Sequence, residues 1–296
     1  MGRFASSEKQ AARAIDAIRA KDPTAIQSLG TARDFQACLK GVCQWMKDNR
    51  LGSLRDITKD QAVAYLQARA ETVGQKALDQ ERQAIQKMQQ VLTGKLQPSE
   101  RLPVVKSELK QVLESRAYAP EQVRLIAEHQ TPKNGLATEI AYAAGLRAHE
   151  LLCIERREDR APSSRPASDD KFAGRDGVMY TVQGKGGLVR EVSIPRALAE
   201  RLEAHRLDVP RDVRDRDIWY HSHYDIGGGV AWSRSFSQAS TRALGYSTGA
   251  HGVRHAYAQE RMHELRAQGL DRWRALEVVS QEMGHFRPEI TETYLR

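Results

Sequence analysis

The first third of the chain repeats apolar residues with the period of an α-helix. From Thr31 onward the apolar positions recur three and four residues apart, and residues 49–52 predict the end of that helix. A second helix with an N-cap signal is predicted from Thr58, and a third over residues 77–92 places its apolar side chains along one side. These patterns predict a small domain made of helices.

The rest of the chain combines helical patterns with one β-type pattern. Residues 94–106 contain two prolines and no regular period, which predicts a linker. Residues 180–194 form two β-rich runs around a glycine-rich tip, the pattern of a β-hairpin. A helix is predicted over residues 256–266, and Pro288 suits the first turn of a last short helix. The predicted fold is mainly α with a small β-hairpin, in four segments: an N-terminal basic helix or arm (1–28), a helical domain (29–96), a linker (97–114) and an α+β domain (115–296).

The charge of the chain favours a polyanionic partner over an acidic small molecule. Its 296 residues carry a net charge of +8 at pH 7, and its pI is about 9.4. Residues 1–110 hold 19 Lys and Arg against 12 Asp and Glu, so nearly all of the excess lies in the first part of the chain. The basic stretch within residues 1–28 is either an arm that contacts nucleic acid or a helix packed on the next domain, and the second is favoured.

Four basic residues are candidates for contacts with a phosphate backbone. Arg82 and Lys87 lie on the third predicted helix, on sides other than its apolar side. Arg234 and Arg242 stand at the two ends of another predicted helix, where they suit contacts with phosphate groups. The polar segment 156–177 is rich in turn formers and predicts a long solvated surface loop, which could also touch nucleic acid or a partner subunit.

The sequence disfavours several other kinds of site. The three cysteines show no metal-binding or redox spacing, so they predict small buried side chains in a reducing compartment. The sequence has no apolar run of 18 residues, so we expect no membrane span and no membrane partner. Residues 221–225 have a His-x-His-x-Asp pattern that could ligate a metal. The glycines that follow mark a flexible loop, however, and we expect no metal there.

The last 46 residues contain side chains suited to a phosphodiester. His251 and Arg254 are three residues apart, so on a helix they point the same way. His285 follows the helix-breaking Gly284, and Tyr294 lies on the last predicted helix, which can return it to the same groove. Two histidines, an arginine and a phenol make a poor metal site, because arginine cannot ligate, but a good site for a phosphodiester.

Two elements upstream complete this chemistry. A tyrosine oxygen can attack DNA phosphorus to form a covalent phosphotyrosine, and forked arginines suit the charge that develops on the non-bridging oxygens. The site therefore needs a second arginine and a proton donor for the leaving 5′ hydroxyl. Arg147 follows a glycine turn, with Glu150 one helical turn later, and Lys185 stands at the tip of the predicted hairpin, free to reach into a groove.

The order of these elements resembles the tyrosine recombinase (phage integrase) family. The resemblance implies a helical core-binding domain followed by a tyrosine recombinase catalytic domain, with no cofactor. The spacing from the second histidine to the tyrosine is also similar. The resemblance implies that Tyr294 attacks the scissile phosphate to give a 3′-phosphotyrosine, while Arg147 and Arg254 hold the non-bridging oxygens of the phosphate. Lys185 would protonate the leaving 5′ oxygen with help from His251. His285 would donate a hydrogen bond to the phosphate, and Glu150 would orient the site.

The resemblance also implies a biological role. Such an enzyme is a site-specific recombinase or integrase that acts on double-stranded DNA attachment sites as a homo-tetramer, and an accessory factor can set its direction. The implied setting is integration or excision of a mobile element, in the cytoplasm and associated with the nucleoid. Two alternatives stay open: a topoisomerase-like nicking and closing enzyme, and a non-catalytic DNA-binding accessory protein. The chain ends two residues after Tyr294, where many family members continue into a segment that docks on a neighbouring subunit, so we expect subunit coupling to use another surface or a further segment.

Overall fold

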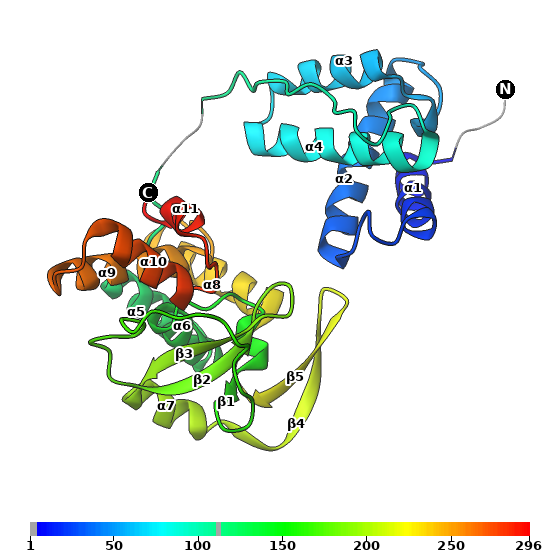
Figure 1. Ribbon diagram of the computed structural model, residues 1–296. Helices are drawn as coiled ribbons and strands as arrows, with labels where there is room; N and C mark the ends of the chain where they lie inside the picture. The colour runs from blue at the N-terminus through cyan, green and yellow to red at the C-terminus, as the bar shows by residue number, and fades with distance from the viewer. Residues whose placement is uncertain (1–4, 111–113) are drawn as a thin grey trace. The chain divides into compact units, whose positions relative to one another are not determined.

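The computed structural model describes residues 5–110 and 114–296 of the chain. The chain forms two compact units, Met1–Val112 (unit 1) and Leu113–Arg296 (unit 2) (Figure 1). The first four residues of the predicted N-terminal segment and residues 111–113 of the predicted linker lie outside the described residues. The described residues are mainly helical with small antiparallel sheets, which confirms the predicted fold class. Among them, none of the helices has the length and apolar composition that crossing a bilayer requires.

Unit 1 is a bundle of α-helices around one apolar core. The apolar stripe predicted from Thr31 faces this core, where Leu39 and Met46 are fully buried. Thr58 caps α3, because its hydroxyl accepts from the Gln61 N–H while the Gln61 side chain accepts from the Thr58 N–H. The elements are α1 (Ser7–Lys21), α2 (Leu29–Asp48), a 3₁₀ turn (Leu54–Asp56), α3 (Lys59–Ala70), α4 (Gln75–Met88) and a π-helical turn (Gln89–Thr93).

Two segments predicted to lie outside the helical domain pack on it. Helix α1 buries Ile18 in the same core as α2 and α4, so the basic stretch is a packed helix. In the predicted linker, Leu102 is also buried in that core. The N–H of Glu108 donates to the Ala70 carbonyl at the end of α3. The chain therefore stays on unit 1 at least as far as Glu108.

Unit 2 is built on a three-stranded antiparallel sheet in the order β1–β2–β3 (Figure 1). Strands β2 and β3 form the predicted hairpin, with Tyr180 opposite Val192. Alternate side chains face the core, where Tyr180, Val182, Val192 and Ile194 are buried. Helices α6 and α7 pack against this sheet. The elements in this part are α5 (Pro120–Glu128), α6 (Pro132–Ala143), a 3₁₀ helix (Glu150–Cys153), β1 (Glu155–Arg156), β2 (Gly177–Gln183), β3 (Val189–Pro195) and α7 (Arg196–Glu203).

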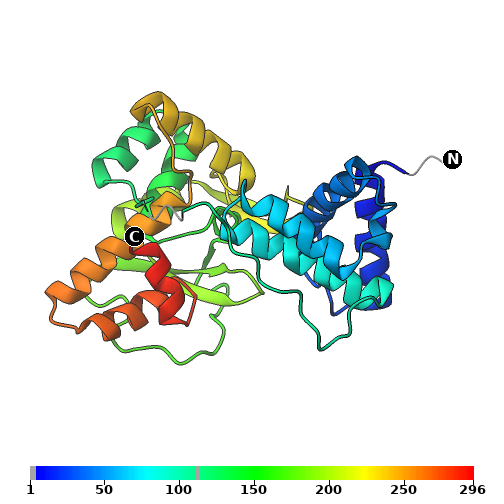
Figure 2. The ribbon, with the colours of Figure 1, turned by 90° about the horizontal axis from the view of Figure 1, so that it is seen from above.

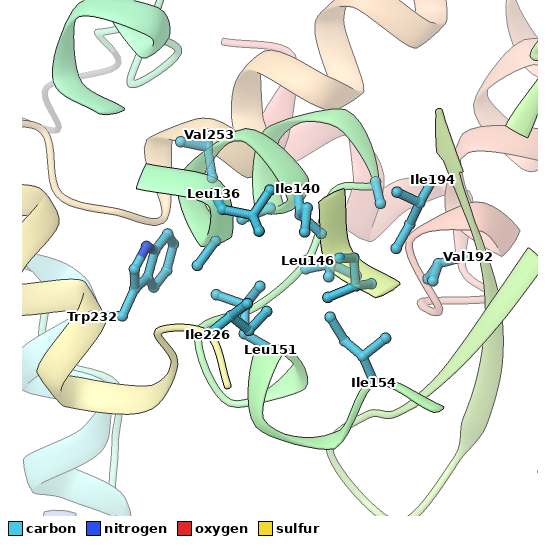
Figure 3. Packing of buried hydrophobic residues seen from close by; sticks show 14 of the residues in the cluster. Leu136, Ile140, Leu146, Leu151, Ile154, Val192, Ile194, Ile226, Trp232 and Val253 are labelled. Carbon is cyan, nitrogen blue, oxygen red and sulfur yellow. The ribbon is translucent and has the colours of Figure 1, made fainter. Parts of the chain in front are cut away.

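Two apolar clusters hold unit 2 together. Figure 3 shows the larger one, where Leu136 and Ile140 of α6 lie near Leu146 and Trp232. The smaller cluster joins α9 and α10 to the end of the chain, and it includes the ring of Tyr294. Helices α9, α10 and α11 accordingly lie side by side in Figures 1 and 2. The helices of this part are α8 (Gly229–Leu244), α9 (Gly252–Ala267), α10 (Arg272–Glu282), α11 (Pro288–Thr291) and a final 3₁₀ turn (Glu292–Tyr294).

The sequence does not predict the second hairpin, in which β4 (Arg206–Asp215) pairs with β5 (Ile218–Tyr224). Most side chains on this two-stranded ribbon are at least partly exposed, so it lacks the alternation of a half-buried strand. At its tip Arg216 and Asp217 have positive φ values of 48° and 64°, as in a type I′ turn, although neither is the glycine or asparagine typical of that turn. The His-x-His pattern lies on β5.

The long polar segment before the first hairpin is a surface loop, as predicted, but its residues 168–175 are anchored to helices. The Arg175 guanidinium donates to both carboxylate oxygens of Glu264 on α9, each at 2.9 Å. The Phe172 N–H donates to the carboxylate of Glu282 on α10 at 2.8 Å. A charged segment can be ordered in this way because its charges and backbone groups find partners that are distant in the chain.

Candidate active site

Arg254 joins two turns of the backbone that are distant in sequence. It lies in the first turn of α9 and is fully buried. Its guanidinium donates to the Gly145 carbonyl, in the turn before Arg147, and at 2.5 Å to the Met283 carbonyl, in the turn before His285. Burial and the nearby Arg147 lower the pKa of Arg254 to about 10, so the side chain keeps its charge at neutral pH. Helix α9 thus places one permanent charge between the two turns.

Glu150 holds Arg147 in one orientation. Arg147 Nη1 donates to Glu150 Oε1 and the Arg147 N–H donates to Glu150 Oε2, both at 2.8 Å. The Glu150 side chain is completely buried, whereas 22% of the Arg147 side chain is exposed. Burial alone would raise the pKa of Glu150, but Arg190, Arg254 and Arg147 lower this pKa well below the usual range. The carboxylate is therefore charged and can orient the Arg147 guanidinium.

Tyr294 packs against His251, His285 and Arg254. Its hydroxyl lies 3.2 Å from His251 Nε2, and its ring stacks on the His285 ring with the centroids 5.1 Å apart. The guanidinium carbon of Arg254 lies 5.7 Å from the centre of the tyrosine ring. Only 9% of Tyr294 is exposed. The structure therefore brings four of the predicted site residues together and places the phenol within reach of a base.

The surroundings of the two histidines keep them neutral. Burial and Arg254 lower the pKa of His285 to about 3, and the same causes lower the pKa of His251, which is more open to solvent. Neutral His251 can accept the Tyr294 proton at Nε2. His285 Nε2 accepts from Arg254 at 3.0 Å, so its ring proton sits on Nδ1, which lies 3.2 Å from the Thr291 hydroxyl. His285 can therefore donate to a phosphate only after its bond to Arg254 opens.

One face of α9 holds the tyrosine segment. His251, His255 and Gln259 are spaced four residues apart and lie on this face. The His255 and Tyr294 rings have centroids 4.7 Å apart, and His255 Nδ1 is buried without a hydrogen-bond partner among the described residues. Gln259 Nε2 donates to the carbonyls of Tyr294 at 3.1 Å and Arg296 at 2.9 Å. In the sequence, the four-residue spacing of these side chains is the one feature that indicates a shared helix face.

No family model matches the chain, and a search of curated proteins finds no match. Among solved structures, XerH recombinase bound to palindromic difH substrate, in a post-cleavage complex, has a TM-score of 0.62 at 14% identity, over 98% of this chain and 93% of that one. A lambda integrase dimer bound to a COC′ core site has a TM-score of 0.61 at 17% identity, over 96% and 76% of the two chains. Tn1549 integrase in complex with transposon right end DNA has a TM-score of 0.56 at 12% identity, over 99% and 95%. The chain has the tyrosine recombinase fold.

Lys185 lies at the tip of the β2–β3 hairpin of this tyrosine recombinase fold, as the sequence predicts. The tip closes through a 2.7 Å hydrogen bond from the Gly184 N–H to the Leu188 carbonyl. A Cβ atom placed on Gly184 would lie 3.4 Å from Glu150 Oε1 and 3.9 Å from Arg147 Nη1. The Lys185 side chain is exposed and forms no hydrogen bond or ion pair with the described residues. Gly184, the residue before Lys185, thus lies beside Arg147 and Glu150, and the Lys185 amine has no partner among the described residues.

The other predicted contact residues differ in their surroundings. Arg82 is only partly exposed and donates to the Leu102 carbonyl at 3.4 Å, so it is engaged within unit 1. Lys87 lines a shallow basic depression of unit 1. On α8, Arg234 is exposed, and Arg242 is exposed but donates to a backbone carbonyl at 2.8 Å. Their contacts with nucleic acid remain predictions.

The His-x-His-x-Asp stretch is occupied by local pairs. His221 Nδ1 lies 3.0 Å from Asp212, and Asp225 accepts from Arg211 at 2.7 Å and also pairs with Lys133. Over residues 5–110 and 114–296, no group of three or more His, Cys, Asp or Glu side chains could hold a metal ion. These side chains therefore join the β4–β5 ribbon and its neighbours.

Arg190 is the main site residue that the sequence does not predict. The sequence around Arg190 gives one indication of its role, its position on β3. The alternation of the strand places Arg190 on the same inward face as Val192 and Ile194. A charged residue at an inward strand position needs a partner. The sequence cannot show which partner that is.

Proposed function

We propose that this protein cleaves and rejoins DNA strands as a site-specific recombinase or integrase, through a covalent phosphotyrosine at Tyr294. The observation that carries the proposal is the Tyr294 hydroxyl, 3.2 Å from His251 Nε2 and beside the buried Arg254. Arg147, oriented by Glu150, supplies a second charge close to Arg254. The similar folds of DNA-bound XerH and lambda integrase and the net charge of +8 also support a DNA substrate.

The proposed chemistry is a reversible transesterification. The Tyr294 oxygen attacks phosphorus while its proton passes to His251 Nε2. The bond from phosphorus to the 5′ oxygen breaks, which leaves a 3′-phosphotyrosine and, with a proton from Lys185, a free 5′ hydroxyl. Arg147 and Arg254 offset the charge that develops on the non-bridging oxygens. Religation runs the same exchange backwards, so the reaction involves neither oxidation nor hydrolysis.

The tyrosine segment must rearrange before a phosphate can reach Arg254. Arg254 has no exposed surface, and the Tyr294 ring lies over its guanidinium. Arg254 Nε is buried without a hydrogen-bond partner among the described residues, so this N–H is available to a phosphate oxygen. We infer that the structure corresponds to the protein before DNA binding, and that the phosphate takes the place of the tyrosine ring beside Arg254.

A nicked duplex that traps the covalent intermediate tests the proposal. Target DNA is selected by binding from a randomised pool of duplexes, and nicked forms are incubated with wild type and with Tyr294→Phe in the presence of EDTA. A covalent protein–DNA band from wild type alone is expected. A band that persists in Tyr294→Phe would place the nucleophile elsewhere and refute the assignment. Relaxation of a supercoiled plasmid that lacks the selected site would instead favour the topoisomerase-like alternative.

We further propose that the substrate is a double-stranded attachment site and that strand exchange takes place in a homo-tetramer. An accessory directionality factor, a mobile-element setting and a cytoplasmic, nucleoid-associated location follow from the same resemblance. Light scattering of the protein on a four-way DNA junction tests the assembly. The mass of four chains per junction is expected, and a complex that saturates at one chain would contradict it.

A further inference from the structure

Arg190 is a buried arginine between the two turns that carry the site. It is 3% exposed and stands on β3. Its Nη2 donates to Glu150 Oε2 at 2.8 Å and to the Gly145 carbonyl at 3.3 Å, while its Nη1 donates to the Glu282 carbonyl at 2.5 Å. A guanidinium inside a protein is costly unless its donors are paired. These bonds pair both terminal nitrogens, so the side chain is held in one position.

The bond to Glu150 connects Arg190 to Arg147. The two arginines share the same buried carboxylate, Arg147 through both oxygens and Arg190 through Oε2. Of the charged groups around Glu150, Arg190 contributes most to keeping the pKa of the carboxylate low against its burial. A charged, immobile Glu150 is what orients Arg147. Arg190 therefore acts on Arg147 through the carboxylate.

The bonds to backbone carbonyls connect Arg190 to His285. Arg190 and Arg254 both donate to the Gly145 carbonyl, and they bind consecutive carbonyls at the end of α10, those of Glu282 and Met283. The turn that follows closes over Arg190. A Cβ atom on Gly284, whose φ is +73°, would lie 2.6 Å from Arg190 Cδ. The position of His285 thus depends on the side chain beneath its turn.

We propose that Arg190 is a positioning residue that keeps the Arg147 turn and the His285 turn in register around the reacting phosphate. This inference rests on the proposed function. Arg190 does not itself reach a phosphate, because it lies beneath the Gly284 turn and both of its terminal nitrogens are bonded to Glu150 and backbone carbonyls, whereas the Arg147 side chain is 22% exposed. Its role is to hold both turns through its bond to Glu150 and its two bonds to the Gly145 and Glu282 carbonyls.

The test separates two properties of Arg190, its positive charge and the planar guanidinium that donates in two directions. Arg190→Met removes both, and Arg190→Lys keeps the charge but cannot donate in two directions from a planar group. Arg196→Met is the matched control, because Arg196 follows the same strand and pairs with Asp176 at the surface. The measurements are the rate of covalent complex formation on the nicked duplex and the DNA Kd by gel shift. We expect an unchanged Kd for all three variants, a rate about 100-fold lower in Arg190→Met, a lower rate in Arg190→Lys, and a wild-type rate in the control.

A second readout follows the His285 ring by NMR of histidine-labelled protein without DNA. The charged groups that face this ring are Arg254, Arg147, Arg190 and Glu150, and the Tyr294 ring stacks on it. Because Arg190 is one of the cations that lower the pKa of His285, this pKa should rise in Arg190→Met and stay low in Arg190→Lys. A general loss of stability would not produce this pattern.

A wild-type cleavage rate in Arg190→Met would overturn the inference. If that variant does not fold, the Arg190→Met/Glu150→Gln double variant removes the unpaired carboxylate as well, and a wild-type rate there would overturn it equally. If wild type itself forms no covalent complex, the proposed function fails. In that case the His285 titration still tests whether Arg190 acts on His285, and an unchanged pKa in Arg190→Met would refute that part of the inference.

Discussion

Removing either partner of the buried ion pair between Arg261 and Glu282 is expected to lower the stability of unit 2 by several kcal/mol. Arg261 Nε lies 3.1 and 3.0 Å from the two carboxylate oxygens, and both side chains have 0% exposure. The same carboxylate accepts from the Tyr257 hydroxyl and the Phe172 N–H, each at 2.8 Å. Glu282→Gln would leave the arginine in the interior, with Glu264 as its remaining charged partner. The pair thus anchors both α10 and the segment before β2.

The size of the effect follows from the burial of both groups. Removing one partner of a buried, hydrogen-bonded ion pair costs about 3–5 kcal/mol, because the other charge stays buried. We expect Glu282→Gln and Arg261→Met each to lower the free energy of unfolding by about this amount. The double variant should cost less than the sum of the two, because the uncompensated interior charge is gone. Arg196→Met, which breaks an exposed pair, should cost less than about 1 kcal/mol.

Urea denaturation followed by tryptophan fluorescence measures these differences. Trp45 is the only tryptophan in residues 1–112, so in a Trp45→Phe background the fluorescence reports on unit 2 alone. The two single variants, the double variant and the control are compared in this background. Costs below about 1 kcal/mol for both single variants, or a double variant that costs the full sum, would refute the reasoning.

Three further predictions concern the site. Arg254→Lys keeps the charge but loses the guanidinium that joins two backbone turns. The rate of covalent-complex formation should therefore fall about 100-fold, while DNA binding in gel shifts stays unchanged. An unchanged rate would contradict this. Gln259→Ala removes the hydrogen bonds to the Tyr294 and Arg296 carbonyls that hold the tyrosine segment over Arg254. Each contributes about 1 kcal/mol, so the segment should rearrange more readily and the covalent-complex rate should rise, by at most roughly ten- to thirty-fold. A lower rate, or an equal rise in His263→Ala, a change one turn further along α9, would contradict this. Burial and Arg116 lower the pKa of His255 to about 4, from an unfolded value of about 6.5. The stability that depends on neutral His255 is therefore complete above about pH 6.5 and is lost as the pH falls towards 4. The Tm of wild type should drop more over this pH range than the Tm of His255→Phe. Parallel plots of Tm against pH for the two proteins would contradict this prediction.

Patterns that depend on neighbouring residues predicted the corresponding elements well. The two β-rich runs around glycines became β2 and β3, and the N-cap at Thr58 starts α3. The β4–β5 ribbon was missed because β4 carries charges on both faces and the turn lacks the usual glycine. Propensity is a weak guide where few of the side chains are buried.

The candidate site could be predicted in part, for a related reason. The sequence named His251, Arg254, His285 and Tyr294 from their chemistry and order, and the structure brings these four together. Their catalytic roles remain proposals. The sequence did not identify Gln259, since its contacts are to backbone carbonyls more than 30 residues away.

The sequence by itself determined the helical periods, the turns and the kinds of side chain that converge near the end of the chain. Only the tertiary structure decided which charges share a partner. Glu150 is shared by Arg147 and Arg190, and the polar segment 168–175 is ordered by carboxylates of α9 and α10. The physical reason is that secondary structure follows from spacing along the chain, whereas burial and ion pairing depend on distance in space.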